Sequence, residues 1–286
     1  MAQLDPSLPA PLSAGRFLIR RAVHGVEKLG EQTYFYLRAI QQAFVAIPKH
    51  LGEVLRIVGE ITWGAGALIV GAGTAGVIFF MSFITGGLVG LQGYKGLELI
   101  GAEAFTGFVS AFANTREITP LIAGVTLAAQ VGAAFTAELG AMRINDEIDA
   151  LEVMAIPTLR YLVSTRVIAA LIAITPLYLI SLFASYLATE LAVVKLYGLS
   201  GGTFSHYFHL FLPPIDVFYS LIKAWTFATA VALIHCYYGF NASGGPSGVG
   251  VAVGKAIRSS IVTINVLNLA MSAVMWGAQD TVRIAG

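Results

Sequence analysis

The stretch "VIAALIAITPLYLISLFASYLAT", residues 167–189, contains no charged residue. A helix needs about 20 apolar residues to cross the roughly 30 Å hydrocarbon core of a bilayer, so this stretch predicts a transmembrane helix. The chain around it is of the same kind, with 57% hydrophobic and 12% charged residues. Soluble domains have roughly 45–50% apolar and 25% charged residues. The sequence therefore predicts an integral membrane protein.

Four more charge-free intervals are long enough to cross a membrane: 61–94, 118–137, 224–254 and 259–279. The interval 61–94 exceeds one crossing and is expected to tilt or to project from the membrane. The interval 224–254 runs into the Gly-rich stretch NASGGPSGVG, which predicts a turn before the last span. Continuous apolar runs exclude alternating barrel strands. The predicted fold class is an all-α integral membrane protein with five transmembrane helices.

Residues 1–60 are expected to form an N-terminal segment, and residues 61–286 the transmembrane domain. Within the first segment, apolar residues recur at helical spacing amid basic residues and tyrosines: Leu37, Ile40, Phe44 and Ile47. This pattern is typical of a helix in the membrane interface, with an ordinary soluble amphipathic helix as the alternative. No apolar run follows MAQLDPSLPAPLSAG, so no cleaved signal peptide is expected. The single cysteine, Cys236, excludes an intrachain disulfide framework.

The basic residues predict the orientation. Twelve of the 17 Lys and Arg residues lie before the first span or in the second and fourth connections. The positive-inside rule therefore places the N-terminus in the cytoplasm and the C-terminus outside.

An acidic segment, ELGAMRINDEIDALEVMAIPTLRYL at residues 138–162, separates two uncharged spans. Asn145 is a good N-cap and Pro157 a natural stop, so a short helix is expected. Its apolar face would hold Ile144, Ile148, Leu151 and Ala155, and its acidic arc Asp146, Glu147, Asp149 and Glu152. Because helices on the anionic cytoplasmic leaflet are usually basic, this pattern favours a protein partner over the bilayer. A solvated loop is the alternative.

Four ordered motifs carry a resemblance: LVGLQGY (88–94), REITP (116–120), VGAAFTAELG (131–140) and AELGAMRINDEIDALEVMAIPTLRYLVSTR (137–166). Together they resemble the MlaE/YrbE family of ABC-transporter permeases over about residues 60–280. HCYYGFNASGGPSGVGVAVGKAIR (235–258) resembles the B-type YrbE subunits of mycobacterial Mce lipid-transport systems in particular.

The resemblance implies a permease of the bacterial inner membrane that moves lipids or fatty acids. It implies three kinds of partner: a second permease subunit in a heterodimer, a cytoplasmic ATPase dimer that binds ATP and Mg, and extracytoplasmic MCE-domain proteins. Neither a cofactor, a catalytic residue nor a nucleic-acid partner is expected of this chain. Residues 141–157 would form the coupling helix, which meets the ATPase through Arg143, Asp146, Glu147, Ile148, Asp149, Leu151 and Glu152.

The sequence departs from the family pattern at two places. Ile118 and Thr119 replace the Leu-Gly that commonly follows Arg-Glu, and Ala129 and Gln130 stand where a Gly-Arg element is usual. The missing intramembrane arginine suggests a specialised half of an asymmetric pair.

Three ionisable residues border or interrupt the apolar spans: Arg116, Glu117 and Lys223. Such groups are costly at membrane depth and usually face a cavity or one another, with snorkelling to the interface as the alternative. The resemblance implies that they lie near a lipid-binding cavity. We expect Glu117 to neutralise Arg116, which would leave Lys223 freer to attract an anion.

A small-residue stripe recurs every four positions: Gly124, Ala128, Gly132, Thr136 and Gly140. Such stripes allow close backbone approach between membrane helices. The neighbour is expected within this chain, with a partner permease as the alternative. Gly86, Gly90 and Gly93 leave the same two options open.

Other motifs point to no chemistry. Gly254 and Lys255 lack the first glycine and the Ser or Thr of a phosphate loop. His206 and His209 have no nearby third metal ligand, and His235 with Cys236 lacks a third catalytic member. An ATPase-independent secondary transporter is the alternative function, although no repeat of the spans supports it.

Overall fold

The structure is a computed structural model that describes residues 27, 30–43, 45–46, 50–63 and 73–277. In these ranges the regular structure is entirely helical, without strands. Five helical stretches are long and apolar enough to cross a membrane: Gly73–Glu98, Glu103–Ile144, Leu159–Leu196, Pro214–Phe240 and Gly245–Trp276. The predicted fold class is confirmed.

The spans are built from consecutive elements. The first, fourth and fifth spans are single helices, α3 (Gly73–Glu98), α10 (Pro214–Phe240) and α11 (Gly245–Trp276). The second span joins η1 (Glu103–Phe105), α4 (Thr106–Val109), η2 (Ser110–Ile118), α5 (Thr119–Leu127), η3 (Ala128–Gly132) and α6 (Ala133–Ile144). The third joins η4 (Leu159–Ser164), α8 (Thr165–Leu191) and η5 (Ala192–Leu196). Outside the spans lie α2 (Leu51–Trp63), α7 (Glu147–Val153) and α9 (Gly201–Leu210).

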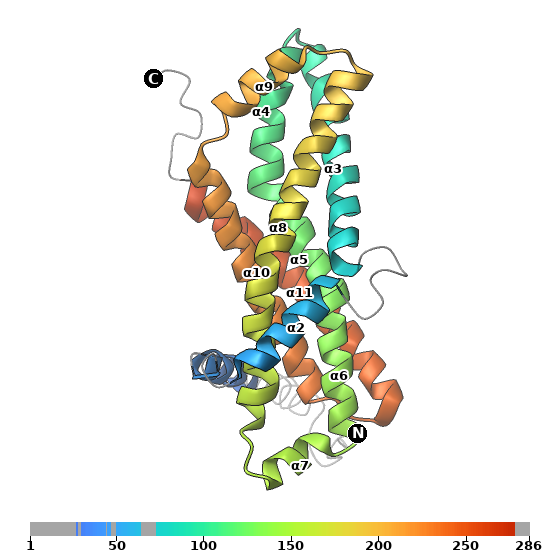
Figure 1. The fold of residues 1–286 in the computed structure, drawn as a ribbon, viewed down its shortest axis with the longest axis vertical. Coiled ribbons are helices and arrows are strands. Elements are labelled where there is room, and N and C mark those ends of the chain that lie inside the picture. Colours follow the sequence, from blue (N-terminus) through green and yellow to red (C-terminus); the bar gives the residue numbers. More distant parts are fainter. Residues whose placement is uncertain (1–26, 28–29, 44, 47–49, 64–72, 278–286) are drawn as a thin grey trace, which may run out of the picture.

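The spans form an elongated bundle with α7 at one end and α9 at the other (Figure 1). We call these the α7 end and the α9 end. Helices α3 and α8 pack closely, because a Cβ on Gly86 would lie 2.4 Å from the carbonyl oxygen of Ser185. Thr189 Oγ1 donates to the Gly86 carbonyl oxygen at 2.7 Å. Gly86, Gly90 and Gly93 of α3 thus serve contacts within this chain.

The small-residue stripe of the second span packs on α10 at Gly124 and Gly132, whereas Gly140 faces Val249 of α11. A Cβ on Gly124 would lie 3.1 Å from the Phe227 ring, and one on Gly132 would lie 2.6 Å from Cδ2 of His235. The Thr136 hydroxyl is 2.8 Å from Nδ1 of His235, so the imidazole is held between the two helices. Because glycine has no side chain, the rings of Phe227 and His235 on α10 fit against the second span.

Residues 30–43 form a helix, blue and seen nearly end-on in Figure 1, so its axis lies across the bundle at the α7 end. Its Phe35 ring packs against Tyr237 and Phe240 of α10. Leu37 and Ile40 are exposed, as a helix in a membrane interface requires. The remaining residues of the expected apolar face, Phe44 and Ile47, lie outside the described residues.

Several predicted span limits are wrong. The turn between the last two spans occupies only residues 241–244, and Lys255 and Arg258 lie on α11 itself, not in a loop. The second and third spans extend beyond 118–137 and 167–189. The described part of the first span is Gly73–Glu98, and the predicted start of this span lies partly outside the described residues. The reason is common to these errors: a charged residue ends an apolar interval in the sequence but does not end a helix.

In the part of the chain that the structure describes, four helical segments have π geometry: η2, η3, η4 and η5. Two of them, η2 and η3, lie on either side of α5 within the second span. Single π turns inside helices frequently occur at functional sites. Here η2 contains both Arg116 and Glu117.

The packing of Gly132 yields a prediction. Replacing Gly132 with Ala should lower the thermal midpoint of the purified protein in detergent, since overpacking a core typically costs about 1–3 kcal/mol. The control is Gly254→Ala on α11, where an added Cβ meets nothing within 4 Å. If Gly132→Ala melts like wild type, the imidazole does not fill this space.

Candidate functional site

Charged and polar side chains from three spans meet inside the bundle. The second span contributes Arg116 and Glu117, α10 contributes Asp216 and Lys223, and α11 contributes Asn268, Ser272 and Trp276. We call this set the charged seam. Two cations and two anions balance, which reduces the cost of burying charge.

Arg116 and Asp216 form the more deeply buried pair. Nε and Nη2 of Arg116 each lie 2.7 Å from Oδ2 of Asp216, and the two side chains are 7% and 6% exposed. Trp276 Nε1 donates to the other carboxylate oxygen at 2.9 Å. The guanidinium carbon also lies 4.4 Å from the centre of the Phe112 ring. Arg116 is thus fixed by an acid and an aromatic ring.

One nitrogen of Arg116 remains available. Nη1 is buried and has no hydrogen-bond partner among the described residues. An unpaired buried donor is costly, and a guanidinium is suited to planar acceptors such as carboxylate or phosphate. The seam therefore contains a cationic donor that is held in place and not saturated.

Lys223 is fully buried, and all its donors are used. Its Nζ donates to the Arg116 carbonyl oxygen at 2.6 Å, to Ser272 Oγ at 2.8 Å and to Glu117 Oε2 at 3.3 Å. Pro120, four residues on, has no N–H that could bond this carbonyl in an α-helical turn. Lys223 therefore gives a backbone carbonyl of the second span a side-chain donor.

The expected pairing of these charges is wrong. Glu117 binds Lys223, while Arg116 binds Asp216, so Lys223 is not the freer cation. Neighbouring residues on a helix do not face each other, so Arg116 and Glu117 meet different elements. Sequence reasoning missed Asp216, although it precedes Lys223 by two helical turns and is the only acidic residue between Glu190 and Asp280.

Glu117 is the most exposed of the four charged residues in the seam, with its side chain 36% exposed. It accepts hydrogen bonds from Ser272 Oγ at 2.6 Å and from Asn268 Nδ2 at 2.7 Å. Asn268 and Ser272 are one turn apart on α11, so one face of that helix holds the carboxylate. The seam thus ties α11 to the second span.

The acidic segment forms a second candidate region at the α7 end. Helix α7 buries Ile148 completely and Leu151 partly, while Glu147, Asp149 and Glu152 are exposed. Arg143 Nη1 pairs with Asp149 at 2.5 Å on the surface.

Three details of the predicted helix are wrong. Ile144, expected on its apolar face, is the last residue of α6 and not part of α7. Asn145 ends α6 instead of capping α7, because Asp146 adopts a left-handed conformation with φ 57°. Ala155 has φ 58° and is exposed, so it lies outside the helix and off its apolar face. Exposed apolar side chains extend the surface instead, since Val153 is 87% and Met154 is 61% exposed. Their sequence signal is an apolar pair next to the acidic arc.

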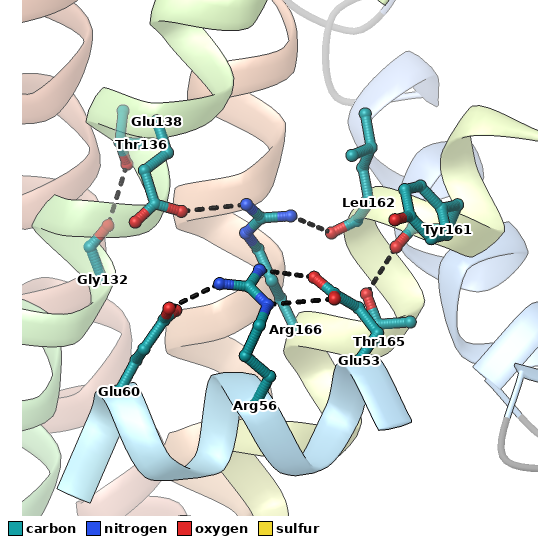
Figure 2. Close-up of polar contacts among 10 residues, drawn as sticks. All are labelled: Glu53, Arg56, Glu60, Gly132, Thr136, Glu138, Tyr161, Leu162, Thr165 and Arg166. Atoms are coloured by element: carbon teal, nitrogen blue, oxygen red, sulfur yellow. Dashed lines mark hydrogen bonds and ion pairs between the residues drawn. The ribbon is translucent and has the colours of Figure 1, made fainter. Parts of the chain in front are cut away.

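An ion-pair cluster closes the base of the hairpin that carries α7 (Figure 2). Arg166 of α8 is buried; its Nη2 lies 2.9 Å from Glu138 of α6, and its Nη1 donates to the Leu162 carbonyl oxygen at 2.8 Å. Beside it on α2, Arg56 pairs with Glu53 and Glu60. The hydrogen bond from Arg56 lowers the pKa of Glu53, so this carboxyl stays ionised to lower pH. The two helices that flank α7 are therefore linked directly.

The remaining sequence motifs lie within the helices α9 and α11. Gly254 and Lys255 lie within a helix and not in a loop. His206 and His209 lie on α9, and His209 Nδ1 is 2.8 Å from the carbonyl oxygen of Ser205. In the described parts of the chain, no three His, Cys, Asp or Glu residues are grouped to hold a metal ion.

The buried pair yields a prediction. Asp216→Leu should destabilise the protein by about 3–5 kcal/mol, because it leaves the Arg116 charge buried without its partner. The double variant Arg116→Met with Asp216→Leu should recover much of the lost thermal stability. Asp149→Leu is the control, since its pair with Arg143 is exposed and worth about 1 kcal/mol or less. Equal losses for Asp216→Leu and the double variant would contradict the pairing.

Comparison with known proteins identifies the family of this chain. The family model for Permease MlaE matches residues 64–274. A probable ABC transporter permease protein of Rickettsia felis is 31% identical over 250 residues, covering 87% of this chain and 92% of that protein. One of Synechocystis is 32% identical over 206 residues, covering 70% and 78%. The chloroplastic protein TRIGALACTOSYLDIACYLGLYCEROL 1 of Arabidopsis thaliana is 29% identical over 245 residues, covering 84% and 70%. The chain is a multi-pass membrane protein and belongs to the MlaE family of permeases.

Proposed function

We propose that the protein is the permease subunit of an ABC-type lipid transporter, driven by a separate ATPase subunit. The relatives named as ABC transporter permeases support the transporter class. The name of the Arabidopsis relative contains that of a glycolipid, which supports a lipid substrate. The observation that carries the proposal is Arg116, a buried and oriented cation with one unpartnered donor between apolar spans.

In this proposal Arg116 binds an acidic lipid head group. Asp216 holds Nε and Nη2 of Arg116, and Trp276 holds Asp216, so the unpartnered Nη1 has a fixed direction. A head group that leaves water loses hydration, and a charge-assisted hydrogen bond offsets part of that loss. Lys223 and Glu117 support the site by tying the spans around it, and the acyl chains meet the apolar walls.

The proposed orientation has the α7 end in the cytoplasm of a bacterium and the C-terminus outside the inner membrane. The distribution of Lys and Arg supports it. The helix of residues 30–43, α2 and α7 lie toward the same end of the bundle, as an N-terminal cytoplasmic segment and a cytoplasmic connection require (Figure 1).

Helix α7 is the proposed coupling helix, within the predicted segment 141–157. Its acidic arc and the exposed Val153 and Met154 form one surface that a basic and apolar groove on an ATPase would fit. The ion pair between Glu138 and Arg166 joins the second and third spans at the base of the hairpin, so a displacement of α7 would be transmitted to both spans. The ATPase would supply the ATP and Mg sites.

The other proposed partners follow from the family resemblance. They are a second permease subunit, which makes a heterodimer, and MCE-domain proteins outside the membrane, with this chain as the B-type subunit. Gln130, in place of a family arginine, supports an asymmetric pair. Solute movement by the purified chain without any ATPase would instead favour the secondary transporter.

The head-group site can be tested with Arg116→Lys, which keeps the charge next to Asp216 and removes the planar fork. We expect lipid bound per purified complex, measured by native mass spectrometry, to fall about tenfold, while basal ATP hydrolysis persists. Arg38→Lys, at an exposed arginine of the helix of residues 30–43, should change neither quantity. Normal lipid occupancy in Arg116→Lys would remove the proposed head-group site.

The coupling surface can be tested by reversing its charge. The double variant Glu147→Lys, Asp149→Lys should insert in the membrane yet recover less ATPase on purification, because reversed charge at an interface can cost about 2–5 kcal/mol. Val153→Asp should act in the same direction, because it places a charge in the apolar part of the contact. Leu99→Asp, at an 88% exposed position near the α9 end, is the control. Undiminished ATPase recovery and lipid uptake in the double variant would exclude α7 as the coupling helix.

A further inference from the structure

A groove of about 1040 Å³ lies between the helix of residues 30–43, α10 and α11. It shares no lining residue with the charged seam. Its wall on α10 runs from Ile222 to Tyr238, which corresponds to about 24 Å along a helix. Half of a hydrocarbon core is about 15 Å thick, so the groove is long enough for an acyl chain of one leaflet.

The end of the groove toward Ile222 is apolar. Thr226 and Thr229 donate their hydroxyl hydrogens to the carbonyl oxygens of Ile222 and Trp225 on their own helix. The Trp225 indole N–H donates to Thr175 of α8 at 3.0 Å. These polar atoms are thus satisfied within the protein, and methyl groups and ring surface remain to line the wall. Val262, which lines the groove from α11, is 64% exposed, so the groove opens sideways.

The other end of the groove is polar. It is lined by Gln32, Thr33, Tyr36, Tyr238, Arg258 and Ser259. The Tyr238 and Ser259 hydroxyls are 3.2 Å apart and join α10 to α11 there. Arg258 is exposed, and within the described chain its single hydrogen bond runs from Nε to the Gly254 carbonyl oxygen. Both Nη groups of Arg258 therefore remain available to a ligand.

Arg258 also marks a boundary along α11. Between Arg258 and Trp276 the helix has no charged residue, whereas Lys255 and Arg258 precede that run. A cation at the edge of an apolar run lies where phosphate groups of a bilayer lie, and cationic side chains there attract anionic lipids. The helix of residues 30–43, which crosses the bundle at this end, provides a second wall at that depth.

We propose that this groove binds an anionic phospholipid of the surrounding bilayer, with its phosphate at Arg258 and one acyl chain along α10. The polarity of the groove matches such a molecule from end to end. The open side allows the second acyl chain to remain in the bilayer. This site is additional to the proposed head-group site at Arg116, and neither binding nor its measurement depends on transport.

The test uses a photo-cross-linking amino acid, benzoylphenylalanine, at Val262 in the purified complex. The complex is placed in phosphatidylcholine nanodiscs with and without phosphatidylglycerol, and adducts are identified by mass spectrometry. We expect phosphatidylglycerol adducts at Val262 in excess of its share of the nanodisc lipid. The internal control is the same amino acid at Val266, which is one turn further on, similarly exposed at 63% and outside the groove. There the adducts should follow the nanodisc composition.

Arg258→Gln should reduce the excess of phosphatidylglycerol adducts at Val262 about tenfold, because it removes a charge-assisted hydrogen bond. Lys255→Gln, an exposed cation on the same helix outside the groove, should leave it unchanged. Adducts at Val262 that follow the bulk composition would overturn the proposal. So would adducts to a peptide, from residues 1–26 or from a second permease. No ATP is added in this experiment, so its outcome does not depend on whether the protein transports lipid.

Discussion

A charge inside a hydrocarbon slab must have a partner, and this constraint organises the bundle. Arg116 and Lys223 cannot reach water, so each is paired with a carboxylate from another span. The pairs fix which faces of the second span, α10 and α11 meet, at a depth where apolar side chains alone would discriminate weakly between registers. Small residues then allow the same helices to approach closely along the rest of their length.

The same constraint explains what a single sequence could predict. Hydropathy identified five spans because a helix of sufficient length and apolarity has few alternatives in a membrane. It misplaced the limits because Lys223 and Glu117 were taken as ends, although their pairing allows both to lie inside helices. The partner of Arg116 is 100 residues away, and no local pattern joins the two.

The acidic segment shows the same division. The spacing of its apolar residues predicts the short helix and the burial of Ile148. The residue at which the helix starts cannot be predicted in this way, since Asn145 and Asp146 are both acceptable at a helix terminus. The left-handed turn at Asp146 fixes the choice by placing Asn145 on the preceding helix. The link between Glu138 and Arg166 depends on how two spans pack, which the residues between them do not specify.

The second span is continuous, but two π-helical segments separate α5 from its neighbours on either side. A π turn holds about one residue more than an α turn, and one residue corresponds to about 100° of rotation about the helix axis. The surplus residues of η2 and η3 therefore set the rotation of α5 relative to its two neighbours. They decide which face of the second span meets the seam and which face carries the small-residue stripe.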